Sequence, residues 1–511
     1  MTHFSVLDYG IFVIYLVASV LVGLLFVKEQ RSIKDYFLAG RSMGPVVVAI
    51  SVLAALFSGI SYLGAPSEVY AHDLSFMLVG LSFFFATPVT NLIFLPFFYR
   101  VRFYTAYQYL EERFSVGVRT LSSALFIIRV LLWLALATYA PALALEQVTG
   151  MPLWFTLVVT AVLTTFYTTL GGMKAVIWTD VMQFVVLFGG QIAIFFVATS
   201  KVPGGLGGVY EIGKAGGKFV LDLSLDPQVR VTLWGLLIGG AFMNLVQMAT
   251  DQVSVQRYMT ATSLREAQKS LWIKLALTLP TAWTFYLTGV VLFAFYQIHG
   301  DPVAAGKIAK ADSILPYFVV NEMPVGMPGI LVAAIYAASM STISAGINAL
   351  TTATLVDFYQ RLWRPKAEPG TLLRLAKWFT LFYGAVVLVL AFVVEKLGTL
   401  LEASNKAIGL VGGPLLGLFL LGMLSKRASA KGAIVGWAAG VAVLTPVCFC
   451  TKVSFLWYAL IGCFVTMGVG WLASLLMPLP PEKSLEGLTW ESRYVEEEEE
   501  APEEEPEAVT V

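Results

Sequence analysis

Hydroxyl side chains cluster in an otherwise apolar stretch of the chain, residues 338–345, which reads Ala-Ser-Met-Ser-Thr-Ile-Ser-Ala. On a helix, Ala338, Ser341 and Thr342 stand at positions i, i+3 and i+4, so two hydroxyls and a main-chain carbonyl face one point. Neutral oxygen ligands suit a monovalent cation that must bind and leave again. The pattern predicts a cation site, although small polar residues also favour close helix packing in membranes.

The composition indicates that these residues lie in a membrane protein. The chain is 58% hydrophobic and 13% charged, with a mean hydropathy of +0.78, whereas soluble domains carry about 25% charged residues. Because a transmembrane helix needs about 20 mainly apolar residues, we expect an all-α polytopic protein with about 13 transmembrane helices. The predicted spans are residues 6–27, 44–66, 75–99, 121–147, 152–170, 175–199, 231–250, 269–297, 326–359, 372–395, 398–424, 430–450 and 453–477.

Lys and Arg are concentrated in one set of alternate loops between the predicted spans, and we assign Arg257, Lys269 and Lys274 to one of these loops. Positively charged loops stay on the cytoplasmic side of a membrane. We therefore expect the protein in the cell (cytoplasmic) membrane, with its N-terminus outside and its C-terminus in the cytoplasm. The first apolar run is longer than a signal-peptide core, so we expect it to remain as a helix.

Two of the predicted spans are interrupted by small and polar residues. The second contains Gly and Ser within residues 54–61, and the seventh contains Gly239-Gly240 followed by polar residues up to 252. Irregular backbone at membrane depth is tolerated where it lines a cavity or is buried in protein. Broken helices five spans apart predict an inverted-repeat transporter with its site at the midplane.

This arrangement divides the chain into two five-helix repeats with additional helices at both ends. The run of Glu near the C-terminus cannot bury apolar surface, so we expect that end to be disordered. The predicted divisions are 1–43 (extra helix and inner loop), 44–199 (first repeat), 200–230 (outer loop), 231–424 (second repeat), 425–477 (two further helices) and 478–511 (acidic cytoplasmic tail).

The substrate site is predicted at the interruption of the second span. Ser58 and Ser61 lie one turn apart there, beside the free N–H groups of the half-helix that begins at this point. Such N–H groups and the positive end of a helix favour a carboxylate. Glu68 lies nearer the outer end of the same span, where we expect a structural role.

Two cationic residues fall inside predicted spans, where a charge normally faces a cavity or an anion. Arg129 is either a counter-ion for a substrate carboxylate or a side chain that extends toward the inner face of the membrane. Lys406 is a second candidate counter-ion, and the alternative is an i, i+4 pair with Glu402. Asn405 is adjacent to Lys406 and is a further candidate substrate ligand.

Other classes of function lack the residues they need. The three cysteines have no metal-ligand spacing, the three histidines are scattered, and no catalytic acid, base or nucleophile cluster lies in the apolar spans. We therefore expect neither an enzyme nor a nucleic-acid-binding protein.

Several motifs resemble those of the sodium:solute symporter family over about residues 6–475. They are residues 35–41 (DYFLAGR), 109–114 (YLEERF), 171–180 (GGMKAVIWTD) and 250–257 (TDQVSVQR). Residues 63–70 (LGAPSEVY), 139–145 (YAPALAL) and 412–419 (GGPLLGLF) are most similar to the monocarboxylate, multivitamin and iodide branch. The resemblance implies a leucine-transporter-type fold with a 5+5 inverted repeat, and alternating access driven by sodium.

The resemblance also implies two sodium sites. The main one would use the carbonyls of Ala54, Phe57 and Ala338 with the hydroxyls of Ser341 and Thr342. The possible second one would use Asp180 and Ser344. An interfacial aspartate paired with a nearby Lys or Arg is the alternative for Asp180.

The second sodium site departs from the family pattern at one position. Ala345 stands where relatives with two sodium ions often carry a hydroxyl, which favours one sodium ion per substrate.

Together these features predict a secondary active transporter that couples sodium to the import of a small, monocarboxylate-like organic anion. Its partners would be sodium ions, the anion and the lipid bilayer. The alternative within transport is a sialic acid, sugar or other polar solute symporter. A membrane sensor that uses the same fold is a remote further alternative.

Overall fold

The computed structural model of the chain describes residues 4–101, 103–394, 400–479 and 485–490. These residues form helices and connecting segments without a strand, apart from an isolated β-bridge between Met43 and Ala261. The α-helices of the first half are α1 (Val6–Leu24), α2 (Ile33–Leu38), α3 (Pro45–Leu56), α4 (Gly59–Ala71), α5 (Phe83–Val89), α6 (Leu95–Val101), α7 (Tyr107–Arg113), α8 (Val116–Thr149), α9 (Leu153–Ser200) and α10 (Gly205–Ala215).

The second half continues in the same manner and includes several short π-helical and 3-10 segments between the α-helices. Its α-helices are α11 (Gly240–Leu245), α12 (Gln252–Tyr258), α13 (Leu264–His299), α14 (Ile314–Glu322), α15 (Met327–Ala353), α16 (Pro369–Ala391), α17 (Leu400–Leu424), α18 (Ala430–Cys450) and α19 (Tyr458–Leu475). Side chains of residues 401–408 in α17 lie outside the part that the structure describes. Asn405 and Lys406 fall there, so their predicted roles stay predictions.

The predicted spans correspond to helices. Within the described residues, nine helices are long and apolar enough to cross a membrane, and α3 with α4 would make a tenth span that bends by 64°. The predicted spans 152–170 and 175–199 both fall in α9, which is interrupted at Gly172 with φ +56°. A Cβ at this position would lie 2.5 Å from Gln30 Oε1, so the break needs glycine.

Both predicted helix interruptions are present. In the second span, α3 ends at Leu56 and α4 begins at Gly59. In the seventh, the π-helical segment η6 (Val246–Thr250) is followed by Asp251, whose backbone is extended with φ −84° and ψ 120°, and α12 begins at Gln252. Each break leaves main-chain groups without helical partners.

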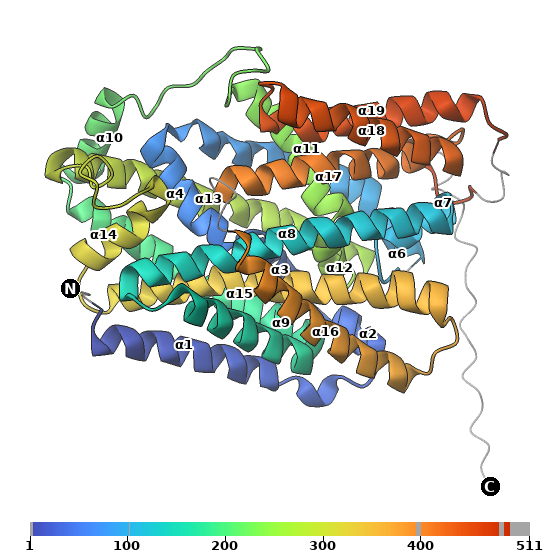
Figure 1. Cartoon of the computed structure of the whole chain (residues 1–511), viewed down its shortest axis with the longest axis horizontal. Helices are drawn as coiled ribbons and strands as arrows, with labels where there is room; N and C mark the ends of the chain where they lie inside the picture. Colours follow the sequence, from blue (N-terminus) through green and yellow to red (C-terminus); the bar gives the residue numbers. More distant parts are fainter. Residues whose placement is uncertain (1–3, 102, 395–399, 480–484, 491–511) are drawn as a thin grey trace, which may run out of the picture.

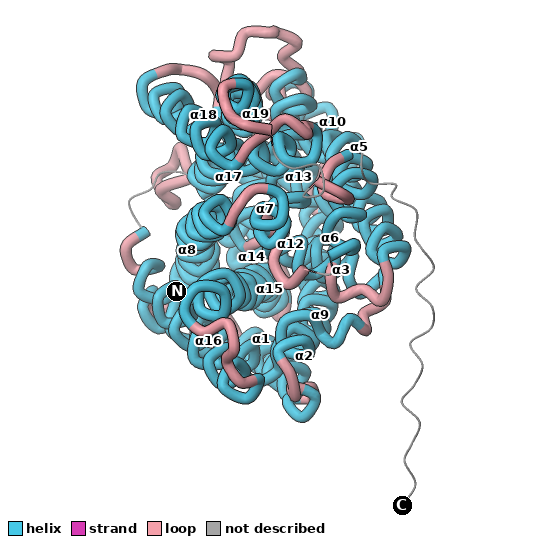
Figure 2. Tube along the Cα trace, turned by 90° about the vertical axis from the view of Figure 1, so that its right-hand side faces the viewer, coloured by secondary structure: helices cyan, strands magenta, loops and turns pink. Residues whose placement is uncertain are grey.

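The helix α15 is the central element of the bundle. In its most apolar window, 94% of the residues are buried, compared with 22% for the first helix. It packs against α1, α3, α8 and α9, and Figure 2 shows it among the helix ends near the middle of the molecule. The hydroxyl cluster at 338–345 therefore lies at the centre of the protein.

The outer helices expose large apolar side chains, including Ile14, Val185, Trp378 and Phe449. Exposed apolar surface of this extent is typical of contact with lipid. In Figure 1, α1 begins at one end of the long axis and α19 ends at the other. An odd number of crossings fits this placement, and the number 13 and the domain boundaries stay predictions.

The predicted acidic tail is described only at residues 485–490. The carbonyl of Leu488 accepts a hydrogen bond of 2.8 Å from the Tyr109 hydroxyl of α7. This short segment is therefore packed on the helices, in contrast to the disorder expected from residue 478 onward. Residues 491–511, with the Glu run, lie outside the described residues.

Candidate functional site

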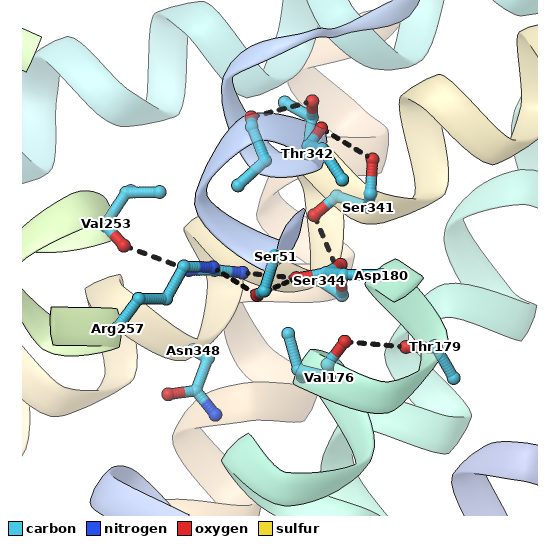
Figure 3. Close-up of polar contacts among 12 residues, drawn as sticks. Ser51, Val176, Thr179, Asp180, Val253, Arg257, Ser341, Thr342, Ser344 and Asn348 are labelled. Carbon is cyan, nitrogen blue, oxygen red and sulfur yellow. Dashed lines mark hydrogen bonds and ion pairs between the residues drawn. The ribbon is translucent and has the colours of Figure 1, made fainter. Parts of the chain in front are cut away.

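The predicted main cation site is assembled between α3 and α15. The Ser341 hydroxyl lies 3.0 Å from the Ala54 carbonyl and 3.1 Å from the Ala338 carbonyl. The Thr342 hydroxyl lies 3.1 Å from the carbonyls of both Ala55 and Ala338. Figure 3 shows Ser341 and Thr342 next to each other on α15. Five oxygens thus converge on a small region.

The break in the second span supplies the carbonyls. In a continuous helix, the carbonyls of Ala54 and Ala55 would accept hydrogen bonds from the N–H groups of residues 58 and 59. Because α3 ends at Leu56, they accept the α15 hydroxyls instead. Phe57 has φ −89° and ψ 81°, and no other described residue donates a hydrogen bond to its carbonyl.

The oxygens of this site fit a monovalent cation. Ser341 and Thr342 are completely buried, and within the described part of the chain their hydroxyls donate to main-chain carbonyls and not to an acidic side chain. Carbonyl and hydroxyl oxygens are hard ligands that replace part of the hydration shell of an alkali ion. The Ala55 carbonyl was not among the predicted ligands, although its position one residue before the helix end is a signal for a free carbonyl.

Asp180 lies in a polar cluster beneath this site, on the second part of α9. One carboxylate oxygen accepts hydrogen bonds from the Ser51 hydroxyl at 2.5 Å and from Arg257 Nη2 at 3.0 Å. The other oxygen is buried without a hydrogen-bond partner among the described residues. Asp180 is completely buried and is paired with Arg257, so the pairing expected in the alternative is present inside the protein.

Ser344 connects the two predicted ion sites along α15. Its hydroxyl donates to the Ser341 carbonyl at 3.0 Å. Ser344 and Asp180 are drawn in the same polar group in Figure 3. The unpartnered Asp180 oxygen is the group in this cluster with unused capacity for a cation.

Arg257 and Ser51 were not predicted as part of this cluster. The Arg257 guanidinium donates to the Ser51 hydroxyl at 2.9 Å and to the Val253 carbonyl at 2.9 Å, and the side chain has no exposed surface. The assignment of Arg257 to a cytoplasmic loop is therefore wrong. Arg257 lies near the end of α12, a short helix that follows the break at Asp251 and is buried inside the protein.

A cavity of about 150 Å³ lies beside the break in the second span. Ser58, Ser61 and Arg129, which were predicted to bind substrate, all line it, and Ser58 is only 2% exposed. The other lining residues are mainly apolar or aromatic and include Leu53, Leu56, Phe57, Ile60, Phe76, Val79, Phe83, Trp133, Met243 and Tyr286. The structure thus brings the predicted substrate residues of the described part to one cavity.

Arg129 is paired inside the protein. Its Nη2 atom lies 2.6 Å from the Asp251 carboxylate, and both side chains are 3% exposed. The alternative in which Arg129 extends to the membrane surface is therefore wrong. Asp251 also accepts a hydrogen bond of 3.0 Å from the Val253 N–H at the start of α12. The positive charge of Arg129 is consequently compensated before any substrate binds.

Lys274 of α13 also lines the cavity, and it was predicted in a cytoplasmic loop. It is 1% exposed, so that assignment is wrong. At the outer end of α4, Glu68 receives two hydrogen bonds from Arg230, of 2.7 and 2.8 Å, in agreement with the expected structural role.

Comparisons with known proteins agree with this geometry. Residues 36–440 match the profile of the "Sodium:solute symporter family". The "Sodium-dependent multivitamin transporter" of Oryctolagus cuniculus is 36% identical over 94% of this chain and 74% of its own length. The human "Sodium-coupled monocarboxylate transporter 1" is 36% identical over 86% of this chain and 73% of its own length. These relatives are transporters and not enzymes.

A solved structure has the same architecture. It is described as the substrate-bound, outward-open state of a sodium-coupled sialic acid symporter, and it is 31% identical with a TM-score of 0.86. The match covers 93% of this chain and 99% of that structure. The fold is thus of the leucine-transporter type, as predicted. With the broken helices and the family profile, these similarities show that the chain belongs to the sodium:solute symporter family, whose members couple solute transport to sodium.

Proposed function

We propose that this sodium symporter imports a small organic anion with a single carboxylate. The observation that carries the proposal is the break at Phe57–Ser58. On one side of it, the carbonyls of α3 face the hydroxyls of α15. On the other side, Ser58 and Ser61 line the cavity at the start of α4. One irregular segment is therefore available to sodium and to substrate together.

The carboxylate would bind at the beginning of α4. The first N–H groups of a helix have no intrahelical acceptors, and the helix dipole makes this end positive. Ser58 and Ser61 add hydroxyl donors at the same place. Apolar side chains around them would hold the remainder of the substrate.

The size of the cavity supports a small solute. Its volume is about 150 Å³, and a cavity of about 150 Å³ accommodates a benzene molecule. A compact monocarboxylate therefore fits better than a sugar acid. The sialic acid alternative derives support from the solved symporter structure, whose description names that substrate.

The ions would bind at the main site, which consists of the carbonyls of Ala54, Phe57 and Ala338 with Ser341 and Thr342. Asp180 and Ser344 would form the second site through the unpartnered Asp180 oxygen, but Arg257 already balances the charge of that carboxylate, which weakens its attraction for a second cation. Ala345 provides no further hydroxyl. These observations favour one sodium ion for each substrate molecule.

The proposed placement is the cell membrane, with the N-terminus outside and the C-terminus in the cytoplasm. It is supported by the distribution of Lys and Arg in the loops, which follows the positive-inside rule. The placement of the start of α1 and the end of α19 at opposite ends of the molecule also supports it.

Uptake into proteoliposomes tests the proposal. We expect an inward sodium gradient to drive accumulation of at least one of propionate, lactate, benzoate and nicotinate, because each is a compact monocarboxylate. An equal potassium gradient should drive none. Accumulation of sialic acid or a neutral sugar, with no sodium-dependent uptake of the four acids, would contradict the proposal and favour the alternative.

A further inference from the structure

We propose that Lys274 binds the carboxylate group of the transported anion and thereby selects substrates that carry one negative charge. This inference rests on the proposed function and names the residue that gives it charge selectivity. Lys274 lies on α13, on the wall of the same cavity that Ser58 and Ser61 line.

The Lys274 ammonium is buried without an acceptor. The side chain is 1% exposed, and its Nζ atom has no hydrogen-bond partner among the described residues. The nearest stabilising contact is the ring of Phe83, whose centre is 3.8 Å away. A cation–π contact replaces only part of the hydration that a buried ammonium loses. An anion that enters the cavity would supply the missing partner.

The other buried cations of the described chain all have acceptors. Arg129 is paired with Asp251, Arg257 with Asp180 and Arg119 with Asp357. Lys218 donates to the carbonyls of Tyr70 and His72, and Arg113 donates to the carbonyls of Gly422, Ser425 and Ala428. Lys274 is thus distinguished from this group by its missing acceptor.

With Lys274 protonated, the described residues that line the cavity carry one uncompensated positive charge. Arg129 and Asp251 neutralise each other at 2.6 Å, and Lys274 is the remaining charged residue of the wall. A monoanion would neutralise the cavity, whereas a dianion would leave a negative charge and a neutral solute would leave the ammonium unpaired. Unpaired charge away from water is costly, so the cavity selects for one negative charge.

The lining of the cavity around Lys274 indicates that the ligand should have an apolar part. Lys274, Thr278, Ala282 and Tyr286 follow each other at i+4 spacing and all line the cavity. The Thr278 hydroxyl donates to the Lys274 carbonyl at 2.7 Å. Lys274 is therefore the cationic end of a stripe that also carries the Thr278 and Tyr286 hydroxyls. Leu53, Phe76 and Trp133 from other helices supply apolar wall beside it, which suits a carboxylate on a small hydrocarbon body.

Binding measurements on purified full-length protein in nanodiscs test this assignment. The probes are propionate, lactate, benzoate and nicotinate, each with its uncharged amide, measured in sodium chloride and in potassium chloride. The variants are K274Q, K274R and the matched control K269Q. Lys269 is on the same helix, but it is half-exposed and paired with Glu266.

We expect K274Q to bind the best acid at least ten-fold more weakly than the wild type, which corresponds to about 1.4 kcal/mol. Its preference for the acid over the amide should be lost, while K274R retains most of it and K269Q is unchanged. Without acid, K274Q should unfold at a temperature no lower than the wild type, because no intramolecular partner of Lys274 is removed.

Two outcomes would overturn the assignment in distinguishable ways. An unchanged acid-to-amide ratio in K274Q, with sodium-dependent binding of the acid intact, would refute the role of Lys274 and leave the proposed function standing. Failure of the wild type to bind any of the acids in sodium would refute the anionic substrate itself, and the role of Lys274 with it.

Discussion

The two broken helices, one in each half of the molecule, differ in how the main-chain groups that each break frees find partners. At Phe57–Ser58 the freed carbonyls of α3 meet the neutral hydroxyls of α15. At Asp251 the freed start of α12 is capped by a carboxylate that is also paired with Arg129. The first break retains oxygens that can bind an ion, whereas the second is neutralised by a charged pair of the protein itself.

This difference indicates that the two breaks have different roles. A neutral oxygen site has capacity for a mobile cation, because no resident charge competes for its ligands. A buried ion pair in contrast holds two elements together, since breaking it leaves an uncompensated charge. The first break is therefore the ligand-binding one, and the second fixes α8 against the start of α12. The following predictions test this comparison.

The largest effect is expected at the first break. Replacing Ser341 and Thr342 together by Ala removes two of five oxygen ligands, and the apparent sodium affinity should fall by about 100-fold or more, at about 1.4 kcal/mol for each factor of ten. Sodium-dependent uptake in proteoliposomes measures this. Ser339→Ala is the matched control, because its hydroxyl is buried on the same helix without a described partner. Sodium dependence like that of the wild type in the double variant would refute the site.

At the second break, Arg129→Gln should reduce stability, because it leaves the Asp251 carboxylate buried without its partner. The expected loss is about 3 kcal/mol, and combining it with Asp251→Asn should recover part of it. Thermal unfolding of the two single variants and the double variant gives the coupling free energy between Arg129 and Asp251. The double variant leaves the net charge of the cavity unchanged, so acids and amides should lose affinity equally in it. A selective loss of acid binding would instead make Arg129 the counter-ion for substrate.

A smaller effect is expected for Ser58→Ala, which removes one hydroxyl donor from the cavity. The apparent constant for the transported anion should rise by about five-fold to ten-fold, because a hydrogen bond to a charged group contributes about 1.5–3 kcal/mol and water replaces part of it. The sodium constant should change less. Flux measured as a function of each solute separates the two constants, and an unchanged substrate constant would move the binding site away from α4.

The smallest effect is expected from the membrane potential. With one sodium ion for each monoanion the cycle carries no net charge, whereas a second sodium ion would add about 2.3 kcal/mol of driving force at 100 mV. The reversal point of flux at a potential set by potassium and valinomycin should therefore not move. Asp180→Asn should then leave the sodium Hill coefficient unaltered. A shift that corresponds to one charge would show that Asp180 and Ser344 bind a second ion.

Local parts of the structure were predictable from the sequence, and long-range pairs were not. The hydroxyls of Ser341 and Thr342 and the interruption before Gly59 are visible in a short window, because helix geometry fixes their mutual positions. Arg129 and Asp251 are 122 residues apart, and Ser51 and Asp180 are 129 apart, so only the folded chain brings them together. Lys274 was counted with a cytoplasmic loop although the predicted span 269–297 contains it, because the sequence does not show whether a cation near a helix end faces the protein interior or the membrane surface.

The interruption at Phe57–Ser58 has a consequence for how the binding of sodium and the binding of the anion are coupled. The carbonyls that would hold sodium and the N–H groups that would hold the anion belong to adjacent peptide units of one segment. Any movement of that segment alters both affinities, and linkage requires each solute to change the affinity of the other by the same factor, commonly about 5-fold to 150-fold. Cooperativity between the solutes therefore needs no signal across the molecule, because a few residues of backbone serve as their common ligand.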